Sequence, residues 1–160
     1  MIEKPIIQNH FTATGIVFNP QGKVLMIKHR KLKVWLPPGG HIDANELPHE
    51  ACKREVFEET GVTVEVLSAS ASVGIGHEAH CQELPTPFVI LLEDIEKNGT
   101  HNHIDMVYIC RTTGDDALQQ NQQETEGIGW FTPAEVAKLD TFNNVIKSIS
   151  AASRKIEGAI

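Results

Sequence analysis

Apolar and β-branched positions alternate loosely with polar ones over residues 11–18 and again over residues 23–29. This period of two is typical of half-buried strands. The intervening Asn19-Pro20-Gln21-Gly22 has the composition of a turn, so the two strands are expected to form a hairpin. Shorter apolar runs predict further strands over residues 62–67, 88–92, 106–111 and 128–131.

Three other segments carry helical signals. The clearest helix is expected to begin with Asn45 as its N-cap, to tolerate Pro48 in its first turn and to end at Gly61. A second helix should open at Thr132-Pro133, because a hydroxyl cap followed by proline is a common helix start. A third is expected over about residues 141–156.

The segments between these elements are expected to be irregular. Residues 35–40 contain two prolines and two glycines, and residues 114–127 are mostly polar. The order of elements is strands, one helix, more strands and two helices. It predicts an α/β (α+β) fold around a mixed sheet, in a single domain over residues 1–160.

Composition and charge narrow the class of protein. A net charge of −7 argues against stable nucleic-acid binding, which needs a basic surface. No apolar run approaches the ~20 residues that span a bilayer, so no membrane association is expected. Cys52, Cys81 and Cys110 are widely spaced, and residues 1–5 lack a signal-peptide pattern. A cytoplasmic protein is therefore expected, and a homodimer is compatible with the sequence.

The expected helix over 45–60 carries an acidic cluster. Glu55, Glu58 and Glu59 lie at i, i+3 and i+4, which places three mutually repelling carboxylates on one helix face. Carboxylate oxygens are the ligands that hard divalent cations such as Mg²⁺ prefer. A solvated acidic face is the common explanation for such a cluster, so the neighbouring residues must decide between the two.

Those neighbours follow a known pattern. The spacing of the glycines and charged residues matches G-x5-E-x7-R-E-U-x-E-E-x-G-U at every position, where U is a bulky aliphatic residue. The matching residues are Gly40, Glu46, Arg54, Glu55, Val56, Glu58, Glu59, Gly61 and Val62. This pattern is the Nudix box, and the chain resembles the Nudix hydrolase family (MutT-like).

The resemblance implies an α/β/α sandwich and a metal-dependent hydrolase. Glu55, Glu58 and Glu59 would bind Mg²⁺, for which Mn²⁺ would substitute, with the Gly39 carbonyl as a further ligand. Arg54 would orient Glu58. Glu46 is expected to be structural, because helix geometry would point it away from Glu55.

The implied reaction is attack of water on phosphorus in a diphosphate bond. Markers of the ADP-ribose, diadenosine-polyphosphate and coenzyme A subfamilies are missing. By elimination, the small nucleotide-type substrate would be a nucleoside triphosphate or a related nucleoside diphosphate derivative. A catalytically idle Nudix domain that regulates by binding nucleotide is the alternative.

Several further residues are candidates for a role in the site. The general base could be Glu55 or Glu58, or Glu124 or Glu126 in the polar loop. Lys28 and Arg30 belong to a basic run and could contact substrate phosphate; the alternative is an exposed hairpin end. Four aromatic residues could stack on a base or belong to the core: Phe11, Trp35, Tyr108 and Trp130.

A loose group of histidines also has metal-binding potential. His77, His80 and Cys81 resemble half of a zinc site, and His101 and His103 could lie nearby. Because the spacing is irregular, loop histidines without a metal are the simpler interpretation.

Overall fold

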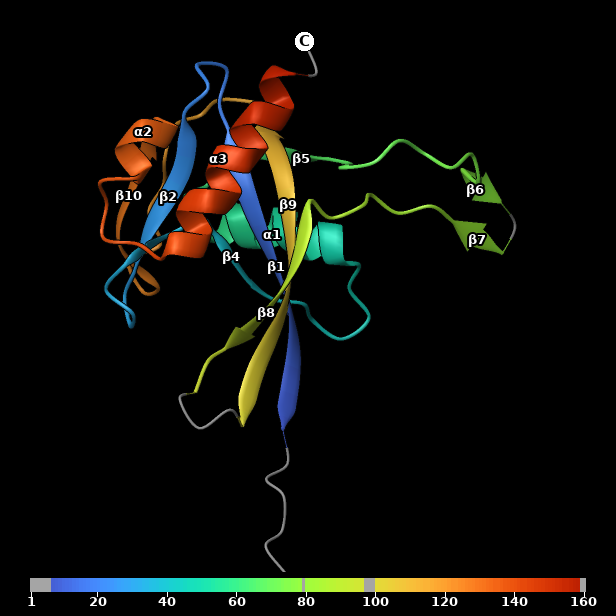
Figure 1. The fold of residues 1–160 in the computed structure, drawn as a ribbon, viewed down its shortest axis with the longest axis horizontal. Coiled ribbons are helices and arrows are strands. Elements are labelled where there is room, and N and C mark those ends of the chain that lie inside the picture. The colour runs from blue at the N-terminus through green and yellow to red at the C-terminus, as the bar shows by residue number, and fades with distance from the viewer. Residues whose placement is uncertain (1–6, 79, 97–99, 159–160) are drawn as a thin grey trace, which may run out of the picture.

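The computed structural model describes residues 7–78, 80–96 and 100–158, with the side chains of residues 77 and 78 excepted. A central mixed sheet lies between helices on its two faces (Figure 1). In chain order the elements are β1 (Gln8–Phe18), β2 (Val24–His29), β3 (Trp35–Leu36), β4 (Gly39–His41), α1 (Pro48–Thr60), β5 (Val64–Leu67), β6 (His77–Glu78), β7 (Cys81–Gln82), β8 (Val89–Asp94), β9 (His101–Thr112), β10 (Thr125–Phe131), α2 (Pro133–Val136) and α3 (Asn143–Glu157).

The sheet is built around one parallel pair. β1 and β9 pair in parallel along their lengths, whereas the other pairings are antiparallel. The main path runs β10-β2-β1-β9-β5, with β3, β4 and β8 paired beside it. This arrangement confirms the predicted mixed sheet and the β1–β2 hairpin.

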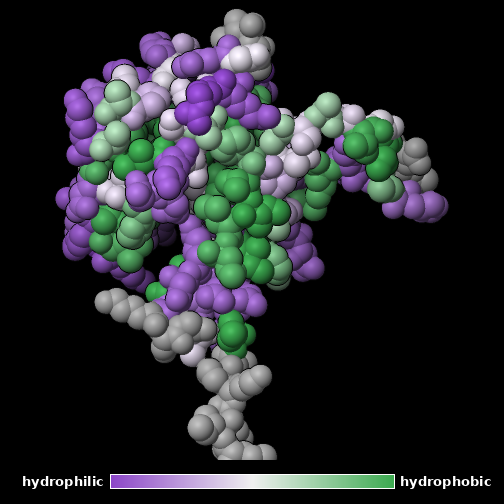
Figure 2. All heavy atoms as spheres, in the orientation of Figure 1, coloured by the Kyte–Doolittle hydropathy of each residue, from purple (hydrophilic) through white to green (hydrophobic). Residues whose placement is uncertain are grey.

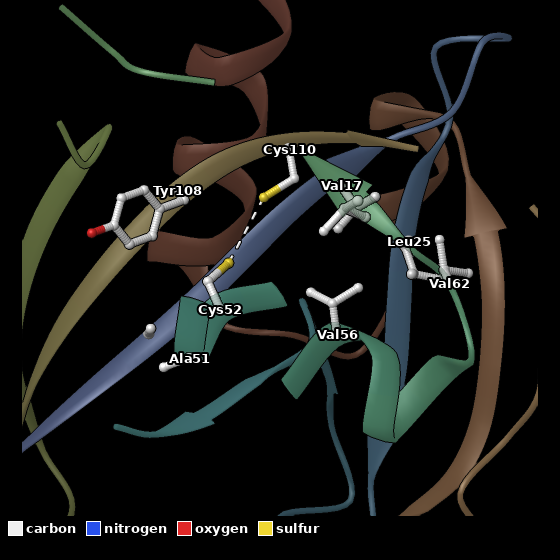
Figure 3. Close-up of a cluster of buried hydrophobic side chains, with 10 residues drawn as sticks. Val17, Leu25, Ala51, Cys52, Val56, Val62, Tyr108 and Cys110 are labelled. Carbon is white, nitrogen blue, oxygen red and sulfur yellow. Dashed lines mark hydrogen bonds between the residues drawn. The ribbon is translucent and has the colours of Figure 1, made fainter. Parts of the chain in front are cut away.

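Two apolar layers hold the helices to the sheet. On one face, Cys52 and Val56 of α1 are fully buried and point toward β1 and β9 (Figure 3). On the other face, Val145 and Ile149 of α3 pack on a second cluster that includes Ile16. Cys52 and Val56 therefore belong to the core, and the α/β/α sandwich is confirmed. Because α1 is anchored by its apolar side, its acidic residues are fixed relative to β1 and β4.

The ends of α1 agree only partly with prediction. Gly61 adopts a left-handed conformation with φ 74°, and its N–H donates to the Phe57 carbonyl at 2.8 Å, so the predicted C-terminal end is confirmed. The prediction of Asn45 as N-cap is wrong. Leu47 is the cap, Pro48 begins the helix, and Asn45 has a φ of 67° in the preceding turn. Proline favours the first helical turn, where its missing N–H costs nothing, and this moves the start downstream.

Other predicted boundaries of strands and loops also differ from those in the structure. β10 begins at Thr125, inside the segment expected to be a loop, because Thr125 pairs with His29. The predicted 35–40 irregular segment contains the two short strands β3 and β4. Thr132 caps α2 in a capping box with Glu135, as the Thr132-Pro133 signal predicted.

The surface shows two features beyond the sandwich. A hairpin of β6 and β7 lies at the end of an arm, away from the sheet (Figure 1). Hydrophobic residues gather beside α3 over β8 (Figure 2), and Ile90 and Leu92 of β8 are 59% and 71% exposed. None of the helices in the described part of the chain has the length and apolar character needed to cross a bilayer.

Candidate active site

Arg54 of α1 connects three acids of the box pattern, Glu46 before the helix and Glu55 and Glu58 within it. Its Nε and Nη2 donate to Glu46 at 2.8 and 2.9 Å, and its Nη1 donates to Glu55 at 2.7 Å and to Glu58 at 3.1 Å. Nη2 also donates to the His41 carbonyl at 3.0 Å. The guanidinium thus holds Glu55 in place as well as Glu58, and only the pairing with Glu58 was expected.

Glu59 differs from its neighbours because it is buried. The residue is only 4% exposed, and its Oε2 accepts a hydrogen bond from the Gly39 N–H at 3.0 Å. Burial raises the pKa of Glu59 to about 8, against the lowering effect of that N–H. The carboxylates of Glu55, Glu124 and Glu58 raise it further. A negative charge at Glu59 is therefore costly unless a cation lies beside it.

Glu55 lies directly against the glycine turn that precedes α1. A methyl group placed on Gly40 would come within 2.6 Å of the Glu55 carboxyl carbon, so only glycine allows this approach. Burial raises the pKa of Glu55, although Arg54 opposes this effect. Glu58 is more open, with 53% of its side chain exposed.

This donor set fits a hard divalent cation. Several carboxylates crowded next to a closely approaching backbone are what such an ion stabilises. In the structure Glu55 and Glu58 accept hydrogen bonds from Arg54, whereas Glu59 accepts one from the Gly39 N–H. Among the described residues, the cluster whose ligand atoms already lie within 4.8 Å of one another is composed of histidines instead.

The polar loop brings one of its two candidate glutamates to this site. The loop packs against the end of α1, where the Asn121 N–H donates to the Glu59 carbonyl at 3.2 Å. The charge of Glu124 raises the pKa of both Glu55 and Glu59. Glu126 instead forms an ion pair with Lys33, which lowers its pKa. The structure therefore places Glu124, and not Glu126, near the box.

The basic candidates lie on the other side of this loop. The Arg30 N–H donates to the Glu124 carbonyl at 3.0 Å, and its guanidinium donates to the Gln122 carbonyl. Lys28 lies on β2, paired with Trp35 of β3. Arg30 thus holds the loop that carries Glu124 through these two hydrogen bonds. The assignment of both basic residues to substrate phosphate stays a prediction.

Glu46 is placed differently from expectation. It precedes α1, so the helix geometry used to point it away from Glu55 does not apply. Its carboxylate accepts from Arg54 and from the Asp43 N–H at 3.0 Å, and the bond to Arg54 lowers its pKa. Glu46 therefore contacts the same guanidinium as Glu55, and its structural role stays a prediction.

The aromatic candidates separate into buried and accessible residues. Tyr108 is 2% exposed in the core, which contradicts a stacking role. Trp35 packs edge-on against Phe131 at 5.1 Å, and the Trp130 indole N–H donates to the Asp116 carbonyl at 3.0 Å. Phe11 is 52% exposed and is the most accessible of the four.

The histidines do not gather as the sequence suggested. β6 and β7 lie on the arm, whereas His101 and His103 belong to the start of β9, which projects below the domain (Figure 1). The two β9 histidines instead meet His10, which sequence reasoning missed because only the β1–β9 register brings it there. Burial and neighbouring imidazoles lower the pKa of His103 to about 4.

Comparison with known proteins matches most of the chain to one protein family. A sequence model of the NUDIX domain matches residues 8–152. A MutT-like protein of Streptomyces ambofaciens is 27% identical over 127 residues, covering 79% of this chain and 66% of that protein. A Bacillus subtilis (strain 168) protein whose name proposes 8-oxo-dGTP diphosphatase activity is 26% identical over 121 residues. That match covers 76% of this chain and 65% of the relative, so the chain spans just under two thirds of both relatives.

Solved structures give the same result. The crystal structure of a NUDIX-family hydrolase from Clostridium perfringens superposes with a TM-score of 0.77 and 30% sequence identity. The match covers 94% of this chain and 99% of that one. The box residues, the sandwich that positions them and these matches agree, and the chain belongs to the Nudix hydrolase family.

Proposed function

We propose that this chain is a Mg²⁺-dependent hydrolase that cleaves a diphosphate bond in a nucleoside triphosphate or related nucleoside diphosphate derivative. Mn²⁺ would substitute, because it accepts the same oxygen ligands. The observation that carries the proposal is the buried carboxyl of Glu59 beside Glu55 and Glu58. A buried acid surrounded by other acids lowers the stability of the fold, so stability alone does not explain its presence. Such groups are concentrated at functional sites.

Four groups are suited to hold the ion: the carboxylates of Glu55, Glu58 and Glu59, and the carbonyl of Gly39. When bound, Mg²⁺ neutralises phosphate charge and makes coordinated water more acidic. Arg54 orients Glu55 and Glu58 through its two hydrogen bonds from Nη1. It is a positioning residue, held in turn by Glu46 and the His41 carbonyl.

The reaction joins a water oxygen to phosphorus and breaks the bridging P–O bond, and the water proton passes to a base. We assign that role to Glu124, whose charge acts on Glu55 and Glu59 and whose loop is braced by Arg30. Glu126 forms an ion pair with Lys33 and serves as the matched control for Glu124. Lys28 and Arg30 supply positive charge for the substrate phosphates in an otherwise acidic protein.

The substrate class rests on two supports. The first is the absence of other subfamily markers from the sequence. The second is the name of the Bacillus subtilis relative, which proposes a nucleoside triphosphate as substrate. Phe11 is the most exposed of the four aromatic candidates for stacking on a base.

The test is a panel of nucleoside triphosphates and nucleoside diphosphate derivatives, assayed for phosphate and pyrophosphate release. Activity should require Mg²⁺, disappear in EDTA and return with Mg²⁺ or Mn²⁺. Glu59→Gln should abolish turnover, whereas Glu50→Gln, an exposed acid on the same helix, should not. Nucleotide binding without turnover on any substrate would favour the idle regulatory domain.

A second comparison tests the base. Glu124→Gln should lower kcat by roughly a hundredfold or more, in the range typical for a general base. Glu126→Gln should leave kcat within about twofold, because its partner Lys33 is exposed and surface ion pairs contribute little. Equal effects of the two variants would remove the assignment of Glu124.

A further inference from the structure

Four of the eight histidines of the chain gather where β1, β4 and β9 meet, and one of them, His41, follows the glycine turn that Glu55 approaches. The starts of β1 and β9 project together below the rest of the domain (Figure 1). In their parallel register His10 lies beside His103, and Gln8 lies beside His101. Residues two apart on a strand share a face, so His10, His101 and His103 point to the same side. His41 of β4 is the fourth ring.

The distances within this cluster are short. One ring nitrogen from each of His10, His101 and His103 lies within 4.8 Å of the others. The closest contact joins His101 Nε2 to His10 Nδ1 at 3.0 Å. His41 packs edge-on beside them, with its ring centroid 4.9 Å from that of His103. In tetrahedral zinc sites, bonds of about 2.0–2.1 Å place nitrogens roughly 3.3 Å apart, so small ring rotations would suffice.

One atom of the cluster lacks the partner that its environment requires. Nε2 of His103 is buried, and no hydrogen-bond partner for it lies within the described part of the chain. A buried polar atom without a partner is costly, and buried nitrogens of this kind are usually satisfied by a protein group, a water or an ion. Packing of the rings against one another does not satisfy Nε2, whereas a cation bound through this nitrogen would.

We propose that His10, His101 and His103 form a second cation site, which binds a borderline divalent transition metal such as Zn²⁺. Imidazole nitrogens suit Zn²⁺, whereas Mg²⁺ prefers the oxygen ligands of the glutamate cluster. The two sites therefore select different ions. Three protein nitrogens leave one tetrahedral position open, and Glu93 stands directly opposite His103 in the β8–β9 ladder. Such an ion would tie the start of β1 to the start of β9.

The test measures Zn²⁺ binding to the full chain, freed of any affinity tag, by calorimetry in the presence of millimolar Mg²⁺. The wild type should bind a single equivalent, and Zn²⁺ should raise its Tm. His10→Gln, which alters an exposed side chain, and the double variant His101→Gln/His103→Gln should both lose this binding. His80→Gln, on the arm, is the matched control and should bind Zn²⁺ like the wild type.

A Glu58→Gln/Glu59→Gln variant separates the two sites. Zn²⁺ binding that persists in this variant supports the histidine site and is independent of hydrolase activity. Zn²⁺ binding that is lost there, or that survives in His10→Gln and in the double histidine variant, overturns the proposal. So does a wild-type chain that binds no Zn²⁺.

Discussion

Replacing Glu59 with glutamine should stabilise the metal-free protein at alkaline pH while removing its response to Mg²⁺. Glutamine keeps the shape of the side chain and an oxygen that can accept the Gly39 N–H. It removes the charge that burial and the neighbouring carboxylates disfavour. The native fold therefore loses a destabilising charge without losing its hydrogen bond.

The sign and size follow from proton linkage. Because the pKa of Glu59 is raised from 4.5 to about 8 on folding, the folded protein binds more protons than the unfolded chain between these values. The wild type consequently loses stability as pH rises from about 4.5 to 8. The whole shift corresponds to about 5 kcal/mol as a ceiling. Relaxation around the charge reduces this, and we expect a difference of about 1–3 kcal/mol between variant and wild type.

Urea unfolding in EDTA at several pH values measures this difference. The stability of Glu59→Gln minus that of the wild type should be near zero at about pH 4 and should reach its plateau above about pH 8. Taking the difference cancels the titration of the histidines. Adding Mg²⁺ should stabilise the wild type but not Glu59→Gln, and Glu50→Gln should follow the wild type throughout. A variant that is less stable at alkaline pH, or a difference independent of pH, would refute the reasoning.

Three other substitutions test the contacts that position Glu55 and Glu58. Gly40→Ala places a methyl group against the Glu55 carboxyl, and kcat should fall roughly tenfold to a hundredfold in steady-state assays without loss of the fold by circular dichroism. Arg54→Lys removes the forked donors, and metal activation should weaken by about 10–100-fold in Mg²⁺ titrations. Glu46→Gln should cost about 1–2 kcal/mol in thermal or urea unfolding, because it weakens a charged hydrogen bond to Arg54. Its half-maximal Mg²⁺ concentration should shift far less than that of Glu59→Gln, and an equal shift would make Glu46 a ligand.

The features predicted correctly from sequence depend on local signals. Gly61 ends α1 because its left-handed φ is a property of glycine itself, and Thr132-Pro133 opens α2 for similarly local reasons. The spacing of Glu55, Glu58 and Glu59 is read directly from helix periodicity. The mixed sheet followed from the order of elements together with the family resemblance.

The features that sequence did not reveal depend on distant contacts. Helix periodicity cannot show that Glu59 is buried, because its cover comes from the glycine turn and from the 114–124 loop. The distinction between Glu124 and Glu126 depends on which of them Lys33 engages. The start of α1 was misjudged because Asn45 has the composition of a cap, whereas Pro48 fixes the actual first turn.

The contacts of Arg54 explain how a repelling acidic cluster can be both stable and ready for a cation. Without metal, the guanidinium neutralises Glu55 and Glu58 by hydrogen bonds from a single nitrogen, Nη1. Its other two nitrogens are fixed by Glu46 and by the His41 carbonyl, neither of which belongs to the carboxylate cluster. Arg54 can therefore release a carboxylate to an incoming ion and still keep its position. Glu59 lacks this compensation, since its carboxylate partner within the described part of the chain is the neutral Gly39 N–H. It is therefore the acid that gains most when the cation arrives.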